Sequence, residues 1–374
     1  MKGVIRLIIL IMDSKESLNE TERRNGFLLL SKYRNAIMGL AAIWVLLFHA
    51  WLPIMPASTP EHFNLFGFLE IYFLDIGYCG VDIFLLVSGI GLTFAIKKGS
   101  LLRFYYRRFR RLVLPPLVVS LFLWNIYGWT TKEFFRNISG IDFFIKNTTC
   151  YLWFIPAIAT LYLLFPLYYK IFEKACKKTL FTAAVIVLWF IISLLLNGHI
   201  RENIYGFTNR IPVFIVGILF GYLTQIRKDI VFTKKHYICL TLVLAAGFYF
   251  AYLTMNLKHN FILPYVNILP NFLIAVSLPF LIAKLLDLAE RYLPKIGKFL
   301  AAAIGIFGTF TLELYCVQEW FVKIIGDMMN DGISKHMINL CMFFTINATA
   351  WVASMVFKYF WELVELPFKR KKTA

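Results

Sequence analysis

Apolar blocks about as long as a bilayer is thick recur along the whole chain, and no other feature restricts its fold as strongly. Hydrophobic residues fill 60% of the 374 positions and charged residues 16%, whereas soluble domains carry roughly a quarter charged residues. A helix needs about 20 apolar residues to cross the hydrocarbon core. The sequence therefore predicts an all-α, polytopic integral membrane protein with about ten transmembrane helices. The expected spans are 36–54, 77–96, 109–128, 150–170, 180–197, 210–226, 236–255, 263–284, 301–322 and 338–358, with 63–76 a candidate interfacial helix.

The net charge of +18 follows this topology and does not indicate a nucleic-acid partner. With the N-terminus placed in the cytoplasm, 31 of the 39 Lys and Arg residues lie on cytoplasmic segments and 8 on the opposite side. Such an excess is the positive-inside rule, which predicts that both termini are cytoplasmic. The basic segments also suit membrane lipids with anionic headgroups and an anionic cytosolic ligand.

No sustained polar linker interrupts the apolar series, which indicates one transmembrane domain. We expect this domain over 33–360, between a cytoplasmic segment at 1–32 and a basic cytoplasmic tail at 361–374. Met1–Asp13 has a short apolar core and no small-residue cleavage site, so it predicts an interfacial segment rather than a signal peptide. A start at Met12 is the alternative.

His49 is the first candidate for chemistry, because it lies in a hydrophobic span. The stretch Ala36–Ile54 (AIMGLAAIWVLLFHAWLPI) contains no acidic, Lys or Arg residue. An ionisable group at membrane depth is expensive and usually faces a protein interior or a watery cavity. Imidazole also transfers protons near neutral pH. A buried histidine that hydrogen-bonds a neighbouring helix is the alternative interpretation.

Asp82 is the expected partner of His49. The first span leaves the cytoplasm and the second returns, and each residue lies five positions inside the outer end of its span. At 1.5 Å per residue, both are about 7 Å below the outer boundary. A carboxylate level with an imidazole can orient a base and stabilise its protonated form. A polar pair that only holds two helices together is the alternative.

Basic residues gather at the cytoplasmic mouth of the third span, in RFYYRRFRRLVLPP. Arginine forks match phosphate oxygens bidentately, although basic residues at a cytoplasmic helix end are also ordinary topology determinants. No GxxxxGKS loop is present to bind a nucleotide. Four of the arginines in this motif lie within five consecutive positions and are the candidates: Arg107, Arg108, Arg110 and Arg111.

Polar side chains in or beside the later spans are candidates for lining a cavity. Trp153 and Arg210 are expected near the outer face. Trp153 is typical of the aromatic belt at a membrane interface. Arg210 is a cation that could meet an anionic intermediate. Glu313 is the costliest to bury and is expected to have a partner. Gln318 lies farther towards the outside on the same span.

The spacing of two glycines predicts close helix packing, and the spacing of the cysteines predicts no metal site. Gly217 and Gly221 form a small-xxx-small pair, which is typical of close helix contact. The six cysteines are scattered without a CxxC pair, so no metal site is expected.

In this order and spacing, the motifs resemble the acyltransferase-3 family of membrane O-acyltransferases. The matching segments are VLLFHA, GVDIFLLVSGI, YYRRFRRLVLPP, YLWFIPAIATLYLLFP, RIPVFIVGILFGYL and TLELYCVQE, over about residues 33–325. The resemblance implies a bacterial membrane enzyme with no bound cofactor. It would take an acyl group, usually acetyl, from cytoplasmic acetyl-CoA and pass it to a hydroxyl of a carbohydrate or other envelope acceptor.

The resemblance also assigns roles to the candidate residues. His49 would be the catalytic histidine, as general base or transient acyl carrier, and the four arginines would lie near the CoA phosphates. Three positions depart from the family pattern: Met38 stands where an arginine is common, Asn35 replaces an aspartate, and Gln318 replaces a histidine. Arg34 lies one turn before Met38 and is a further donor-binding candidate.

Two other functions remain open at this stage. A proton-coupled transporter or flippase would use His49, Asp82 and Glu313 as a proton relay, but the sequence lacks evident inverted halves with Gly- or Pro-broken spans. A catalytically degenerate membrane module is consistent with the three departures. The acceptor, the acyl chain length and the oligomeric state are not specified by the sequence.

Overall fold

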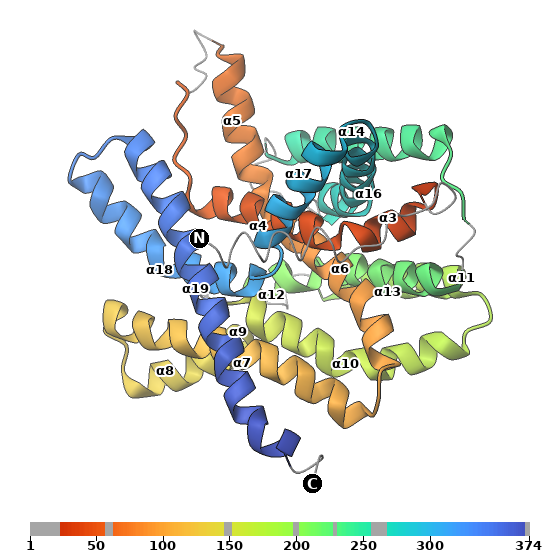
Figure 1. Cartoon of the computed structure of the whole chain (residues 1–374), viewed down its shortest axis with the longest axis horizontal. Helices are drawn as coiled ribbons and strands as arrows, with labels where there is room; N and C mark the ends of the chain where they lie inside the picture. The colour runs from red at the N-terminus through yellow and green to blue at the C-terminus, as the bar shows by residue number, and fades with distance from the viewer. Residues whose placement is uncertain are drawn as a thin grey trace. The chain divides into compact units, whose positions relative to one another are not determined.

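The computed structural model describes residues 23–56, 63–145, 152–196, 202–226, 230–255 and 268–370, and within them every long regular element is an α-helix. The predicted stretch Met1–Asp13 lies outside these residues. The helices are α3 Gly26–Lys32, α4 Arg34–Ala50, α5 Leu65–Asp75, α6 Cys79–Ile96, α7 Leu101–Tyr127, α8 Thr131–Ile138, α9 Ile141–Ile145, α10 Phe154–Lys174, α11 Lys178–Leu195, α12 Glu202–Thr208, α13 Ile211–Ile226, α14 Lys234–Met255, α16 Ile268–Tyr292, α17 Pro294–Phe307, α18 Thr311–Asn330 and α19 Lys335–Arg370 (Figure 1).

The predicted all-α membrane architecture is confirmed. Among the described residues, eight helices are long and apolar enough to cross a membrane, and two broken helix pairs raise the number to ten. The broken pairs are α3 with α4 and α17 with α18. The candidate interfacial helix is α5, which a short 3-10 turn joins to α6.

The first predicted span ends early, and the ninth is broken. The first was expected to reach Ile54, but α4 ends at Ala50 and the following residues are extended or bent. The ninth was expected to be continuous over 301–322, but it is interrupted after Phe307. Thr309 donates both its N–H and its hydroxyl to the Ile306 carbonyl, at 2.9 and 2.7 Å, which ends the helix with a tight turn.

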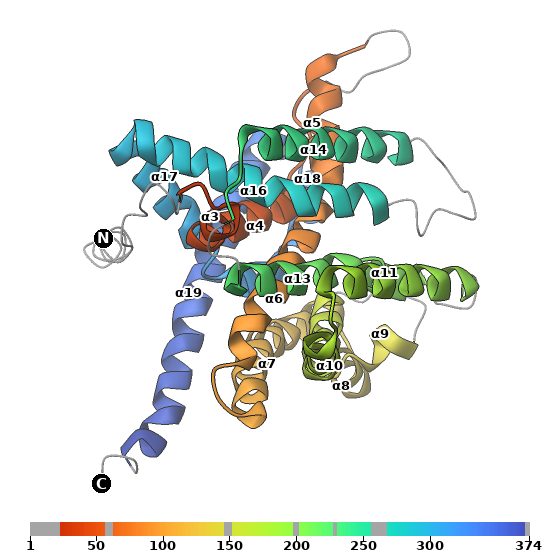
Figure 2. The same ribbon diagram turned by 90° about the vertical axis from the view of Figure 1, so that its right-hand side faces the viewer.

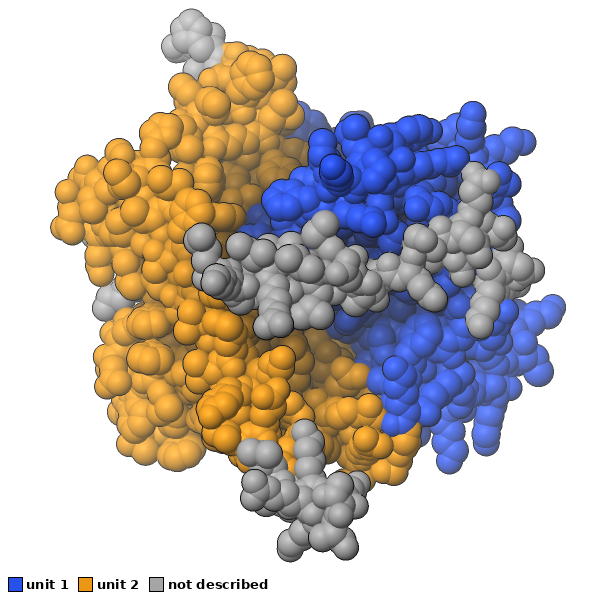
Figure 3. Space-filling view, viewed as in Figure 1, with its two compact units in different colours: residues 1–45, 75–98, 165–309 blue, residues 46–74, 99–164, 310–374 orange. Residues whose placement is uncertain are grey.

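The chain forms two compact units that alternate along the sequence (Figure 3). Unit 1 comprises 1–45, 75–98 and 165–309, and unit 2 comprises 46–74, 99–164 and 310–374. Helix α4 contributes its first three turns to unit 1 and its last turn to unit 2.

Close packing of α6 against α13 forms the centre of unit 1. A side chain at Gly217 would collide with the backbone carbonyl of Leu86, and one at Gly221 would collide with the Thr93 hydroxyl. The predicted small-xxx-small contact is therefore confirmed. On another side of the unit, α14 and α16 lie next to one another (Figures 1 and 2).

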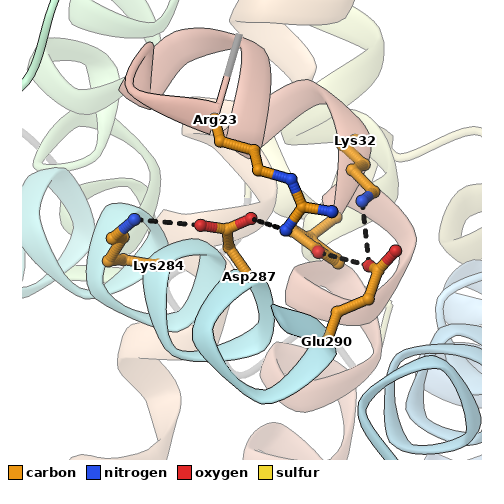
Figure 4. A network of polar contacts seen from close by, with 6 residues as sticks. Arg23, Lys32, Lys284, Asp287 and Glu290 are labelled. Carbon is orange, nitrogen blue, oxygen red and sulfur yellow. Dashed lines mark hydrogen bonds and ion pairs between the residues drawn. The ribbon is translucent and has the colours of Figure 1, made fainter. Parts of the chain in front are cut away.

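Helix α3 is fastened to α16 by aromatic and charged contacts, both inside unit 1. The ring of Phe27 packs edge-on against Phe280 at a centroid distance of 5.5 Å. Beside it, Glu290 accepts hydrogen bonds from Lys32 at 2.8 Å and from the Tyr33 hydroxyl at 2.6 Å. Figure 4 shows this network together with its second carboxylate, Asp287, which pairs with Arg23 at 3.1 Å and Lys284 at 2.9 Å.

Unit 2 is built around α7, α18 and α19. Helix α7 begins at Leu101, before the membrane span predicted over 109–128, and the Ser100 side chain caps it by accepting from the backbone N–H of Arg103 at 3.3 Å. It ends before Gly128, whose left-handed φ of 61° suits glycine. The arginine motif therefore lies within a helix, and its members point in different directions.

Candidate active site

His49 lies in the last turn of α4, at the start of unit 2. Its side chain is half-buried, and its ring packs edge-on against Phe48 at a centroid distance of 4.8 Å. Among the described residues of unit 2, none hydrogen-bonds the imidazole.

Asp82 forms an ion pair with Arg210 inside unit 1. The Arg210 Nε lies 3.3 Å from a carboxylate oxygen of Asp82. The two residues are 1% and 8% exposed, respectively. Arg210 precedes α13 and also donates to the backbone carbonyl of Gly206. Sequence reasoning missed this pair, although the placement of Arg210 at the outer end of its span was the available signal. The expected pairing of Asp82 with His49 stays a prediction.

The four candidate arginines, all on α7, have separate surroundings in unit 2. Arg110 forms an ion pair with Glu365 of α19, and its guanidinium lies 5.8 Å from the Trp361 ring centroid. Arg111 lies 3.9 Å from Glu313 of α18. The expectation that Glu313 has a partner is confirmed. Two members of the predicted phosphate cluster thus already face carboxylates.

Arg108 is the arginine that lines a cavity. Its guanidinium lies over the rings of Phe104 and Tyr162, at 5.5 and 5.4 Å from their centroids. Its Nε is buried and meets no hydrogen-bond acceptor among the described residues. Arg107 instead donates from Nε to the backbone carbonyl of Arg103 at 3.3 Å.

The cavity beside Arg108 has a volume of about 510 Å³ and lies between α7, the α8–α9 turn and α10, all in unit 2. Its walls are mainly apolar, with Leu112 and Pro116 from α7 facing Pro156 from α10. The α8–α9 turn closes one side, where Gly140 adopts a left-handed φ of 72°. The site thus combines one partly buried cation with room for an apolar chain.

The remaining candidates occupy different places. Trp153 is half-buried before α10, next to Phe154, whose backbone N–H donates to the Tyr315 hydroxyl at 3.1 Å. Gln318 is 1% exposed, and neither atom of its amide has a hydrogen-bond partner among the described residues. Arg34 begins α4 in unit 1, where Gly91 of α6 is near its guanidinium.

Sequence reasoning also missed two polar residues that hold the backbone just after His49. Glu70 accepts hydrogen bonds from that segment, and Asn339 both donates to it and accepts from it. An acid in the middle of the apolar helix LFGFLEIYFLD was the available signal for Glu70. No comparable signal marks Asn339.

Comparison with known proteins identifies the family. A protein-family model described as an acyltransferase domain matches residues 33–358, nearly the whole chain. The chain belongs to the acyltransferase-3 family. Neither the curated proteins nor the solved structures gave a match. This acyltransferase-3 protein is therefore a multi-pass membrane acyltransferase, and the resemblance carried by its motifs is confirmed.

Proposed function

We propose that this enzyme transfers an acyl group, most simply acetyl, from cytoplasmic acyl-CoA to a hydroxyl of a carbohydrate or other cell-envelope acceptor in a bacterial cytoplasmic membrane. The observation that carries the donor assignment is Arg108 at the edge of a largely apolar cavity. A partly buried guanidinium with an unused N–H is suited to phosphate. The apolar space beside it suits an extended pantetheine arm.

Within this proposal, the contacts of the four arginines support unequal roles. Arg110 and Arg111 each face a carboxylate, which offsets part of their attraction for an incoming phosphate. No carboxylate among the described residues pairs with Arg108, so we assign it the main contact and Arg107, on the same helix, the second. Arg34 is an auxiliary donor-binding residue in this scheme.

The chemistry needs one base and one nucleophile. In the proposed reaction, His49 removes the proton of the acceptor hydroxyl as its oxygen attacks the thioester carbonyl. The acyl–oxygen bond forms, the acyl–sulfur bond breaks, and the CoA thiolate leaves and takes up a proton. The same imidazole can instead carry the acyl group transiently before the hydroxyl attacks.

Supporting roles go to the other candidates. Asp82 would orient or charge the His49 imidazole, and Arg210 would meet the anionic intermediate. Trp153, Glu313 and Gln318 are proposed to shape the acceptor cavity. Because Asp82 and Arg210 already pair, their proposed roles require that the pair be separated or act jointly.

Calorimetric titration of the purified protein with acetyl-CoA at two salt concentrations tests the donor assignment. We expect binding that weakens as salt rises, because phosphate contacts are largely electrostatic. Arg108→Gln should weaken binding clearly, whereas Arg103→Gln, an exposed arginine on the first turn of the same helix, should not. An absence of binding at low salt would overturn the assignment and favour the transporter or the degenerate module.

A further inference from the structure

The chain just after His49 is held by hydrogen bonds along almost its whole backbone. Helix α4 ends at Ala50, and the N–H of Trp51 makes the last helical bond, to the Leu47 carbonyl at 3.1 Å. The next residues have no regular structure. We name Trp51–Met55 the clamped segment, and all of its contacts described below lie within unit 2.

Glu70 of α5 holds one side of the clamped segment. Its carboxylate accepts from the backbone N–H of Ile54 at 3.1 and 3.0 Å, and from that of Met55 at 2.7 Å. The indole N–H of Trp51 reaches the same carboxylate at 3.4 Å. Three donors from one short segment therefore converge on a single charged acceptor. Hydrogen bonds to a charged group are about twice as strong as neutral ones.

Two residues of α19 hold the other side. The Asn339 amide accepts from the backbone N–H of Leu52 and donates to the carbonyl of the same residue, both at 2.8 Å. Asn339 is 1% exposed, so loss of these bonds would leave its buried amide unpaired, which is costly. At the start of α19, Lys335 donates to the Pro53 carbonyl at 3.2 Å.

These contacts leave little freedom to the end of α4. Pro53 has a fixed φ and no N–H to satisfy. Each of the three backbone N–H groups between Leu52 and Met55 donates to Glu70 or Asn339. Helix ends otherwise fray, because their last carbonyls lack intrahelical partners. His49 precedes the clamped segment by two residues, so the direction of the last turn determines where its imidazole points.

We propose that Glu70 and Asn339 are positioning residues, which fix the height and direction of His49 through the clamped segment. This inference rests on the proposed function of His49. Displacing a reacting group by about 1 Å can cost a hundredfold in rate. A clamp made of a carboxylate and a bidentate amide limits such displacement without touching the substrate.

Two substitutions test the clamp in the purified, full-length enzyme. Asn339→Ala removes both bonds to Leu52, and Glu70→Gln removes the charge and one acceptor oxygen. Both variants should lower kcat by roughly ten- to a hundredfold and leave the KM for acetyl-CoA nearly unchanged, since the donor site is not part of the clamp. Asn347→Ala is the matched control, because this buried α19 residue donates within its own helix, to the Phe343 carbonyl at 2.7 Å.

Two measurements on the same proteins do not depend on turnover. Hydrogen exchange at Leu52, Ile54 and Met55 should become roughly tenfold faster in the clamp variants, and the rate at which diethylpyrocarbonate modifies His49 should change with it. Neither rate should change in Asn347→Ala. Activity that falls only in proportion to the folded fraction, with kcat per folded molecule retained, would overturn the positioning role.

The result for His49→Ala separates this inference from the proposed function. If His49→Ala is inactive while Glu70→Gln and Asn339→Ala keep full kcat, the positioning role is wrong and the proposed function stands. If His49→Ala keeps its activity, the proposed function fails, and the positioning role of Glu70 and Asn339 fails with it.

Discussion

The guanidinium of Arg210 and the carboxylate of Asp82 are joined at 3.3 Å inside unit 1, with both side chains almost completely buried. Asp82 lies in the first turn of α6, which follows α5 through a short 3-10 turn. The pair therefore stabilises the unit only while both members are present, because either charge left alone in an apolar interior is costly.

Asp82→Asn should destabilise the protein by about 3–5 kcal/mol, because it leaves the buried Arg210 charge without its partner. Combining it with Arg210→Gln should cost much less than the sum of the two single changes. Thermal unfolding of the two single variants and the double variant in detergent measures this coupling. Additive losses would contradict a direct pair.

The Asp82→Asn variant also tests the predicted role of Asp82 as the orienting partner of His49. That hypothesis expects Asp82→Asn to lose rate while it keeps its thermal stability and acceptor affinity. Measuring kcat and the melting temperature on one purified sample decides between the two roles. A stable but slow enzyme supports orientation, whereas an unstable enzyme with normal kcat per folded molecule supports the ion pair alone.

His49→Ala should abolish acyl transfer and leave membrane insertion intact, because removing an imidazole makes an apolar span easier to insert. Insertion is followed by membrane fractionation, and transfer by mass spectrometry of envelope glycans for the acetyl increment. A normally inserted His49→Ala protein that keeps full transferase activity would contradict the mechanism.

Arg108 should matter more for the donor than Arg110. Arg108→Gln should raise the KM for acetyl-CoA without a comparable rise for the acceptor, and Arg108→Lys should restore it poorly if the phosphate contact is bidentate. Arg110→Gln should chiefly release Glu365 and affect stability, because that ion pair ties α7 to α19. Steady-state kinetics with each substrate varied in turn separates these effects. Equal KM values for Arg108→Gln and the wild type would exclude Arg108 from the donor site.

Gly217→Val should destabilise unit 1 by about 1–3 kcal/mol or more, because any side chain there meets the Leu86 carbonyl across the helix contact. Gly326 of α18 provides the control, since a Cβ at that position has no atom within 4 Å. Gly326→Ala should stabilise its helix by roughly 0.5–1 kcal/mol. Thermal unfolding distinguishes the two, and a neutral Gly217→Val would show that α6 and α13 are less tightly packed.

The number of spans could be predicted from the sequence because hydrophobicity is a local property. Each expected block corresponds to a helix or a broken helix pair. Helix ends were harder, because they depend on particular hydrogen bonds. An apolar pattern does not indicate that the Thr309 hydroxyl helps to end α17. It also does not indicate the contacts made beyond Ala50, where α4 ends.

Ion-pair partners were not predictable, because they depend on which helix faces pack together. Depth along the spans placed Asp82, His49 and Arg210 all near the outer face, yet it could not tell which two of them pair. For Glu313, the need for a partner followed from its cost in the membrane, but the identity of Arg111 required the packing of α18 against α7. The spacing of the arginine motif likewise did not reveal that two members face acids.

The bond between Leu52 and Asn339 joins residues that are 287 positions apart. Ribosomes add roughly 5–20 residues per second, so about 15–60 s pass between the synthesis of the two partners. Throughout that interval the end of α4 exists without the amide that binds it. A nascent chain therefore completes this contact only after the start of the last described helix has been synthesised, which makes maturation of the histidine-bearing turn a late event in biosynthesis.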